Sequence, residues 1–206
     1  MMRIASLLIA SANPHKIREI KRILAGCPMK VVGAREAGID IDVEEDGATF
    51  EVNAVKKALA FASCAGVFAL ADDSGLEVDA LGGRPGVYSA RYAGLPEVSY
   101  EANNRKLLLE MENVPDERRT ARFVCVVAFA SPKESIFTSR GQVEGLITRA
   151  PRGTAGFGYD PVFLYPPFAQ TFGELSEERK NTISHRARAL EAFRQKFFQW
   201  LENNPS

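Results

Sequence analysis

Short apolar segments alternate with segments of helical periodicity in the first third of this 206-residue chain, and this alternation most constrains its fold. Buried strands are predicted over residues 4–10, 30–33 and 67–71. Between them, apolar residues recur at the spacing of an amphipathic helix. Strands that alternate with helices along a chain are typical of an α/β protein.

The two helices predicted between these strands carry end signals. Asn13 can cap the first helix, Pro14 suits its first position, and Gly26 is expected to end it. The second helix is predicted over about 49–65, with Gly66 as its stop. Its expected apolar face consists of Val52, Val55, Leu59 and Ala62.

The second half of the chain follows a different pattern. A helix is predicted over about 99–112, and two strands over 120–130 and 135–148 are joined by a short turn. A glycine-rich loop over 151–160 precedes a short strand over 162–165. The final helix has an apolar face made of Leu190, Phe193, Phe197 and Leu201. A hairpin after the early alternation indicates a mixed sheet rather than a purely doubly wound one.

Charge and hydropathy exclude several classes of protein. The chain has 26 Lys and Arg against 26 Asp and Glu, and this zero net charge argues against a dedicated duplex-DNA binder. The apolar runs reach only about eight residues, whereas a membrane-spanning helix needs roughly 20. The apolar stretch near the N-terminus is too short for a signal peptide. We therefore expect a cytoplasmic protein that forms one domain over residues 1–206, with two lobes and no separate linker.

Cysteine and histidine usage limits the metal chemistry. Cys27, Cys64 and Cys125 are far apart, and Cys64 and Cys125 are expected in the core, as in a protein of a reducing compartment. The only histidines are His15 and His185, which excludes a site of several histidines. Carboxylates would have to hold any metal, which favours Mg²⁺ or Mn²⁺.

Two polar segments follow predicted strands directly. Residues 11–16, Ser-Ala-Asn-Pro-His-Lys, lie at the start of a helix, where backbone N–H groups suit a phosphate, although a simple cap explains the spacing more readily. Asp72 and Asp73 are expected at the C-terminal end of a strand, where α/β sheets gather ligands. A divalent cation would offset their repulsion, and a solvated turn is an equal alternative.

Three further segments are candidates. The acidic residues 44–46 precede Lys57, although such runs are usually solvated. In the loop over 153–160, Phe157 and Tyr159 can either stack on a base or pack into the core. The segment 180–186 places cations near the start of the last helix, where the helix dipole disfavours them unless a partner is present. Taken together, carboxylates mixed with lysines fit a triphosphate bridged to the protein by Mg²⁺.

These segments resemble the inosine triphosphate pyrophosphatase family, the XTP/dITP diphosphatases, in the style of its bacterial members. The matching motifs are SANPHK (11–16), FEVNAVKKA (50–58), ADDSGLEVDALGGRPGVYSARYAG (71–94), TARF (120–123), PRGTAGFGYDP (151–161) and KNTISHRARAL (180–190). They cover nearly the whole chain in the order found in the family. The resemblance implies an elongated mixed β-sheet with flanking helices and two lobes around a substrate cleft. It also implies a homodimer and Mg²⁺-dependent hydrolysis of ITP, dITP and XTP to the monophosphate and pyrophosphate.

The same resemblance assigns roles by position. Asp73 would be the catalytic residue, and the metal ligands would be Asp73 and Glu45, with Glu44 as a further candidate. The substrate-binding residues would be Ser11, Ala12, Asn13, Pro14, His15, Lys16, Lys57, Ser74, Phe157, Gly158, Tyr159, Asp160, Lys180, His185 and Arg186.

Base selection is a question of hydrogen bonding. Hypoxanthine and xanthine present a 6-oxo acceptor where adenine presents an amino donor. Donors from His185, Arg186 or the loop backbone would therefore favour the oxo purines. Two alternatives stay open: a related pyrophosphatase for pyrimidine or modified triphosphates, and a nucleotide-binding sensor without turnover.

Overall fold

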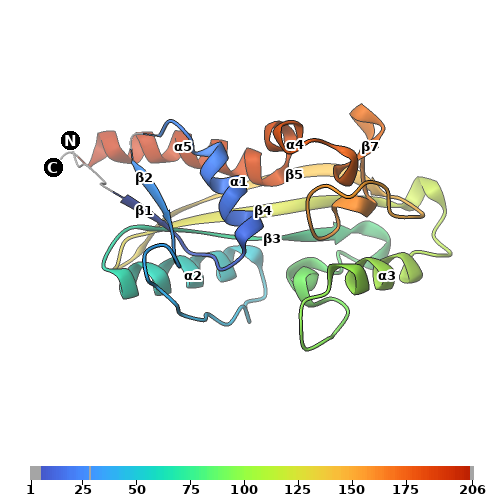
Figure 1. Cartoon of the computed structure of the whole chain (residues 1–206), viewed down its shortest axis with the longest axis horizontal. Coiled ribbons are helices and arrows are strands. Elements are labelled where there is room, and N and C mark those ends of the chain that lie inside the picture. Colours follow the sequence, from blue (N-terminus) through green and yellow to red (C-terminus); the bar gives the residue numbers. More distant parts are fainter. Residues whose placement is uncertain (1–5, 28, 205–206) are drawn as a thin grey trace. The chain divides into compact units, whose positions relative to one another are not determined.

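A seven-stranded mixed sheet is the main feature of the computed structural model, which describes residues 6–27 and 29–204 (Figure 1). The strand order is β2-β1-β3-β4-β5-β6-β7. Strand β1 is parallel to β2 and β3, whereas β6 is antiparallel to β5 and β7. The strands are β1 (Ser6–Ile9), β2 (Lys30–Gly33), β3 (Ala69–Val78), β4 (Thr120–Ala130), β5 (Ser135–Ile147), β6 (Phe163–Tyr165) and β7 (Gln170–Thr171). The predicted mixed α/β sheet is confirmed.

The helices begin where capping side chains predict. Asn13, Thr49 and Ser99 each accept hydrogen bonds from the first turn of the helix that follows. The α-helices are α1 (Pro14–Ile23), α2 (Phe50–Ala65), α3 (Tyr100–Glu110), α4 (Glu177–Ile183) and α5 (His185–Asn203). Short 3₁₀ turns cover Asp79–Leu81, Gly86–Arg91, Asp116–Arg118, Asp160–Val162, Pro166–Phe168 and Phe172–Glu174. Helix α4 was not predicted from the sequence.

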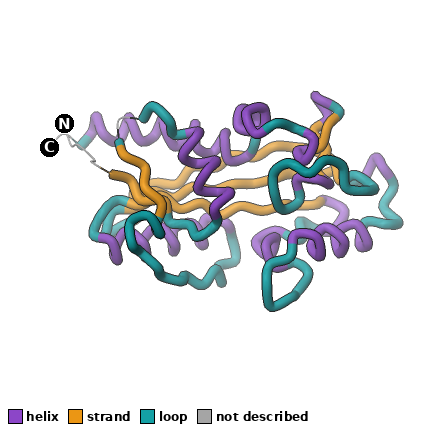
Figure 2. The backbone as a smooth tube through the Cα atoms, in the orientation of Figure 1, coloured by secondary structure: helices purple, strands orange, loops and turns teal. Residues whose placement is uncertain are grey.

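The chain forms two compact units. Figure 2 distinguishes the helices, strands and loops along the backbone. Unit 1 comprises residues 1–73, 125–141 and 186–206, and unit 2 comprises residues 74–124 and 142–185. In unit 1, α1 and α5 share a core with the strands, and α2 lies on the other side of those strands (Figure 1). This core includes Leu7, Ile9, Ile20, Leu24, Leu70, Phe129, Leu190, Phe193, Phe197 and Leu201. The predicted apolar face of the last helix is therefore confirmed.

Unit 2 has a core of its own. Side chains from α3 and from the strands meet there, and Phe123 stacks with Phe172 at 5.8 Å between ring centroids. The other buried members include Leu76, Val78, Leu107, Met111, Val143, Tyr159, Val162 and Phe163.

The apolar face predicted for α2 is wrong apart from Ala62. Val52 is 52% exposed, and Val55 and Leu59 are half-buried. The buried face instead consists of Phe50, Asn53, Ala54, Lys57, Ala58, Phe61 and Ala62. Small alanines allow this face to pack closely, and two polar side chains are buried among them. Lys57 lies within this buried face.

The strand predicted over 67–71 begins at Ala69 and continues to Val78, so the alternative of a solvated turn at Asp72 and Asp73 is wrong. In the strand predicted over 4–10, residues 4 and 5 lie outside the described residues. Cys125 is buried as expected, whereas Cys64 is exposed. No helix within residues 6–27 and 29–204 is long and apolar enough to cross a membrane.

Candidate functional site

Asp72 and Asp73 lie in the middle of β3, so the expectation that they follow the end of a strand is wrong. Successive side chains of a strand point to opposite faces of the sheet. Asp72 accordingly contacts residues of α1 and α5, and Asp73 contacts α2. The two carboxylates therefore have separate surroundings within unit 1.

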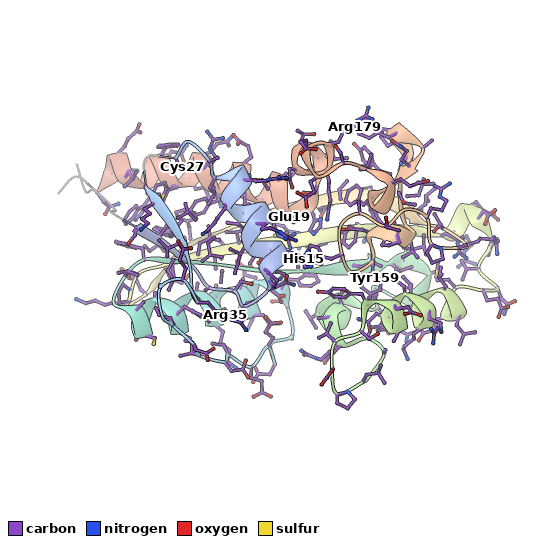
Figure 3. All side chains as sticks on the ribbon, in the orientation of Figure 1. His15, Glu19, Cys27, Arg35, Tyr159 and Arg179 are labelled. Atoms are coloured by element: carbon purple, nitrogen blue, oxygen red, sulfur yellow. The ribbon has the colours of Figure 1, made fainter. Side chains whose placement is uncertain are left out.

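Asp72 is the acceptor in a buried ion network. Its Oδ2 atom lies 3.0 Å from Arg186 Nη2 and 3.2 Å from Lys16 Nζ. Burial alone would raise the pKa of Asp72, but the positive charges of Lys16 and Arg186 hold it far below its usual range. Arg186, whose side chain is 1% exposed, also forms an ion pair with Glu19 of α1, which Figure 3 labels. Asp72 therefore stays ionised and serves as the counter-ion of two cations.

Asp73 has the opposite electrostatic environment. The residue is 5% exposed, and its Oδ2 atom accepts a hydrogen bond of 3.0 Å from Asn53 Nδ2. Burial raises the pKa of Asp73, and although Lys57 and Lys16 act in the opposite direction, the net shift is upward. A raised pKa makes a carboxylate a stronger base than an ordinary exposed one.

The acidic loop reaches this region through Glu45. Lys57 Nζ donates to Glu45 Oε1 at 2.5 Å and to the backbone oxygen of Asp72 at 2.7 Å. Glu44 is exposed, and Asp46 pairs with Lys56 at 2.7 Å. Of the two glutamates predicted as metal ligands, Glu45 contacts Lys57 next to β3, whereas Glu44 is exposed.

The first turn of α1 is capped by its own side chains. Asn13 Oδ1 accepts hydrogen bonds from the N–H groups of His15 (2.9 Å) and Lys16 (3.4 Å), and Ser11 Oγ accepts one from Asn13 N (3.2 Å). Ala12 and Pro14 are exposed. The cap therefore occupies the N–H groups of His15 and Lys16, which are among those predicted to bind phosphate. The segment also places the Lys16 side chain beside Asp72.

In unit 2, Asp160 organises the glycine-rich loop. Its Oδ2 atom accepts hydrogen bonds from Phe157 N at 2.8 Å and from the buried Lys180 Nζ at 2.6 Å. Lys180 Nζ also lies 4.9 Å from the centroid of the Phe157 ring. Gly156 has a φ of +75°, and a Cβ atom there would lie 2.0 Å from Asp160 Oδ2, so the loop requires glycine at this point. The half-buried Phe157 ring is thereby held against the ammonium group of Lys180.

Other predicted residues of unit 2 serve its packing. Tyr159, labelled in Figure 3, is 4% exposed and donates from its hydroxyl group to Ser89 O at 2.9 Å, which favours the structural interpretation of this side chain. Gly158 O accepts a hydrogen bond from Asn104 Nδ2 at 3.0 Å. The His185 ring stacks on Phe123 with 4.7 Å between centroids. Ser74 is half-buried and follows Asp73 in β3.

Sequence reasoning missed three polar residues at these sites: Asn53, Asn104 and Glu19. Asn53 and Lys57 are one helical turn apart, so this polar pair within an alanine-rich stretch was the available signal. Glu19 and Asn104 show no local signal, because their partners are distant in the sequence.

The chemistry of the acidic side chains in unit 1 suits a hard cation. Mg²⁺ is usually held by one or two carboxylates together with phosphate oxygens and water. Asp73 and Glu45 supply such a pair, and the charge of Glu45 contributes to the raised pKa of Asp73. Among the residues that the structure describes, no group of three or more His, Cys, Asp or Glu is placed to hold a metal by protein ligands alone. The residues present fit a cation whose remaining ligands would be phosphate oxygens of the substrate and water.

Comparison with known proteins gives consistent matches over nearly the whole chain. A model of the Ham1 family matches residues 7–196. A dITP/XTP pyrophosphatase of Desulforamulus reducens is 54% identical over 184 residues, 89% of this chain and 91% of the relative. The dITP/XTP pyrophosphatase of Bacillus subtilis is 47% identical over 190 residues, 92% of this chain and 96% of the relative.

Solved structures match the fold as well. The Ham1 protein of Staphylococcus aureus superposes with a TM-score of 0.82 at 44% identity, covering 94% of this chain and 98% of that one. A HAM1 protein from Coxiella burnetii gives a TM-score of 0.85 at 38% identity with the same coverage.

Proposed function

Because this chain belongs to the Ham1 family, we propose that it hydrolyses dITP, XTP and ITP to the nucleoside monophosphate and pyrophosphate. The observation that carries the proposal is identity of about half the residues, over nearly the full length, with relatives named dITP/XTP pyrophosphatase. Such a reaction removes non-standard purine nucleotides from the nucleotide pool. The buried, proton-accepting Asp73 supplies a group for the chemistry.

The proposed reaction is attack of water on the α-phosphorus. The new bond joins the water oxygen to phosphorus, the bond from the α-phosphorus to the bridging oxygen breaks, and pyrophosphate leaves with the electron pair. Asp73 orients the water and accepts its proton. A bound Mg²⁺ held by Asp73 and Glu45, or Mn²⁺ in its place, would polarise the phosphate oxygens and favour ionisation of water.

Lysine side chains are proposed to hold the phosphates. Lys16, in the first turn of α1, pairs with the Asp72 carboxylate. Lys57 donates a hydrogen bond to the backbone oxygen of the same aspartate. Positive charge at these positions would stabilise the negative charge that grows on the departing pyrophosphate. Polar groups of residues 11–16 would add hydrogen bonds to the same phosphates.

The base is assigned to residues of unit 2. Phe157 offers a ring face, and stacking on an aromatic side chain is typical of base binding. Lys180 and His185 are donors suited to the 6-oxo group of hypoxanthine and xanthine, and Ser74, Gly158 and Asp160 are proposed to bind or shape the substrate site. Arg186 was expected to contact the same oxygen. Its ion pairs with Asp72 and Glu19 support a role in holding Asp72 instead.

Three features of the whole protein belong to the same proposal. We take residues 1–206 as one pyrophosphatase domain that works as a homodimer, as the family resemblance implies. The cysteines at 27, 64 and 125 are free thiols, which supports a reducing compartment such as the cytoplasm. Light scattering coupled to size exclusion would test the dimer.

The test is a pyrophosphate-release assay with Mg²⁺ over dITP, XTP, ITP, GTP, ATP and dTTP. We expect the highest kcat/KM for dITP, XTP and ITP, with pyrophosphate rather than orthophosphate as the product. Preferred turnover of dTTP would favour a pyrimidine pyrophosphatase. Tight binding of dITP without release of pyrophosphate would favour a sensor.

A further inference from the structure

Asn53, in the second turn of α2, is fully buried and uses both ends of its amide. Its Nδ2 atom donates to Asp73 Oδ2 at 3.0 Å, and its Oδ1 atom accepts from Gly47 N at 2.8 Å. A buried amide is costly unless it is hydrogen-bonded, so these two bonds fix the orientation of the side chain. Asn53 thus joins the acidic loop to β3.

The loop side of this connection is tight. A Cβ atom on Gly47 would lie 2.6 Å from Asn53 Oδ1 and 2.7 Å from Val52 Cγ1. Only glycine allows the loop backbone to approach the amide so closely. Glu45 lies two residues before this contact and is held by Lys57 of the same helix. Together with the exposed ion pair between Asp46 and Lys56, these contacts attach the loop to the first two turns of α2.

We propose that Asn53 is a positioning residue that fixes the carboxylate of Asp73 relative to the loop carrying Glu45, so that the two acidic groups form a preassembled cation site. The inference rests on the proposed function, because it concerns the same site. Asn53 itself would touch neither the reacting phosphate nor the cation. Residues that orient metal ligands typically affect metal affinity or activity by about 10–100-fold.

The decisive variant is Asn53→Leu in the full-length chain. Leucine is close to asparagine in size, removes both the donor that faces Asp73 and the acceptor for Gly47 N, and brings no further carboxylate to the cation. Two quantities are measured: the dissociation constant for Mn²⁺ alone, from the spin-resonance signal of the free ion, and kcat and KM for dITP with varied Mg²⁺. We expect Mn²⁺ binding and kcat to weaken by roughly 10–100-fold, with little change in KM for dITP.

A matched control is Asn103→Leu. Asn103 is 2% exposed and also uses both ends of its amide, accepting from Ala93 N at 2.7 Å and donating to Ala90 O at 2.9 Å. It lies in unit 2 and has no assigned part in the reaction. We expect this variant to lower the stability of the protein and to leave its Mn²⁺ affinity at the wild-type value. An equal loss of Mn²⁺ affinity in both variants would overturn the inference.

A second variant covers the case in which Asn53→Leu does not fold. Gly47→Ala displaces the loop while retaining the groups of the Asn53–Asp73 hydrogen bond, and weaker Mn²⁺ binding is again expected. If the wild type hydrolyses dITP but a folded Asn53 variant keeps the wild-type Mn²⁺ affinity and kcat, the positioning role of Asn53 is overturned and the proposed function stands. Asn53-dependent Mn²⁺ binding without any pyrophosphate release by the wild type would overturn the proposed function and keep the inference.

Discussion

Neighbouring carboxylates in β3 differ because each faces a different set of side chains. Asp72 meets the cations Lys16 and Arg186, and its pKa is lowered. Burial raises the pKa of Asp73, although the hydrogen bond from the Asn53 amide acts in the opposite direction. The alternation of side chains along a strand therefore places a carboxylate with a lowered pKa next to one with a raised pKa.

For Asp73 we predict that Asp73→Asn retains the fold and loses turnover. Asparagine has nearly the same size and can still hydrogen-bond, but it cannot accept the proton of the attacking water. A loss of general-base catalysis is worth about 10²–10⁴-fold, which kcat for pyrophosphate release from dITP would show. Circular dichroism provides the control for folding. A well-folded variant with a kcat near that of the wild type would refute the assignment.

For Asp72 we predict a loss of stability that depends on pH. Asp72→Asn leaves Lys16 and Arg186 without their shared anion, and breaking a buried pair in this way costs about 3–5 kcal/mol of unfolding free energy at pH 7. The native pKa lies below the value of about 3.9 for an unfolded aspartate, so this stability is complete above that value and declines as the pH falls below it.

Urea unfolding of the wild type and Asp72→Asn at pH 7 and at successively lower pH measures this dependence. The difference between the two proteins should narrow as the pH falls below about 4. A difference that stays constant across this range would show that Asp72 contributes packing rather than charge.

At the scale of elements, helix α2 and the loop of residues 156–160 both bury polar groups. Helix α2 buries Asn53 and Lys57 among alanines, so its polar groups reach β3 from a closely packed helix. The loop is shaped by the Asp160 carboxylate, which binds one backbone N–H and one lysine. Both elements hold charged or aromatic groups by buried hydrogen bonds rather than by apolar packing alone.

For this loop we predict that Phe157 contributes to substrate binding and Tyr159 to the stability of the fold. Phe157→Ala should raise KM for dITP, because loss of base stacking costs about 1–3 kcal/mol. Tyr159→Phe should leave KM unchanged and lower the unfolding free energy by about 0.5–1.5 kcal/mol, because its hydroxyl bond to Ser89 O is lost. Steady-state kinetics and urea unfolding of both variants provide the measurement. An equal rise of KM in the two variants would contradict the separation.

At the scale of the whole molecule, 26 acidic and 26 basic side chains give no net attraction for a triphosphate, so its binding depends on local charge. Asp72, Asp73 and Glu45 lie among Lys16 and Lys57 in unit 1. These carboxylates would repel a bare triphosphate, and a divalent cation would offset the repulsion.

We therefore predict that chelation abolishes turnover reversibly. Pyrophosphate release from dITP should stop in excess EDTA and return when Mg²⁺ or Mn²⁺ is added beyond the chelator. Thermal unfolding in EDTA serves as the control, because the protein should remain folded. Full activity in excess EDTA after removal of bound metal would contradict the need for a cation.

By itself the sequence determined the mixed α/β architecture, most element ends and the segments that carry the chemistry. These depend on local signals: the helix cap at Asn13, the helix stop at Gly66, apolar periodicity in the last helix, and motifs such as 71–94 that resemble a known family.

Only the tertiary structure decided how these groups are used. It placed Asp72 and Asp73 within a strand, buried α2 by its alanine face, and joined Arg186 to Glu19 across 167 positions of sequence. It also gave Asn53 its two partners. The physical reason is that a buried polar group is costly unless it is hydrogen-bonded or paired, so its partners determine its pKa and its role. These partners lie far away along the chain, where local sequence signals do not indicate them.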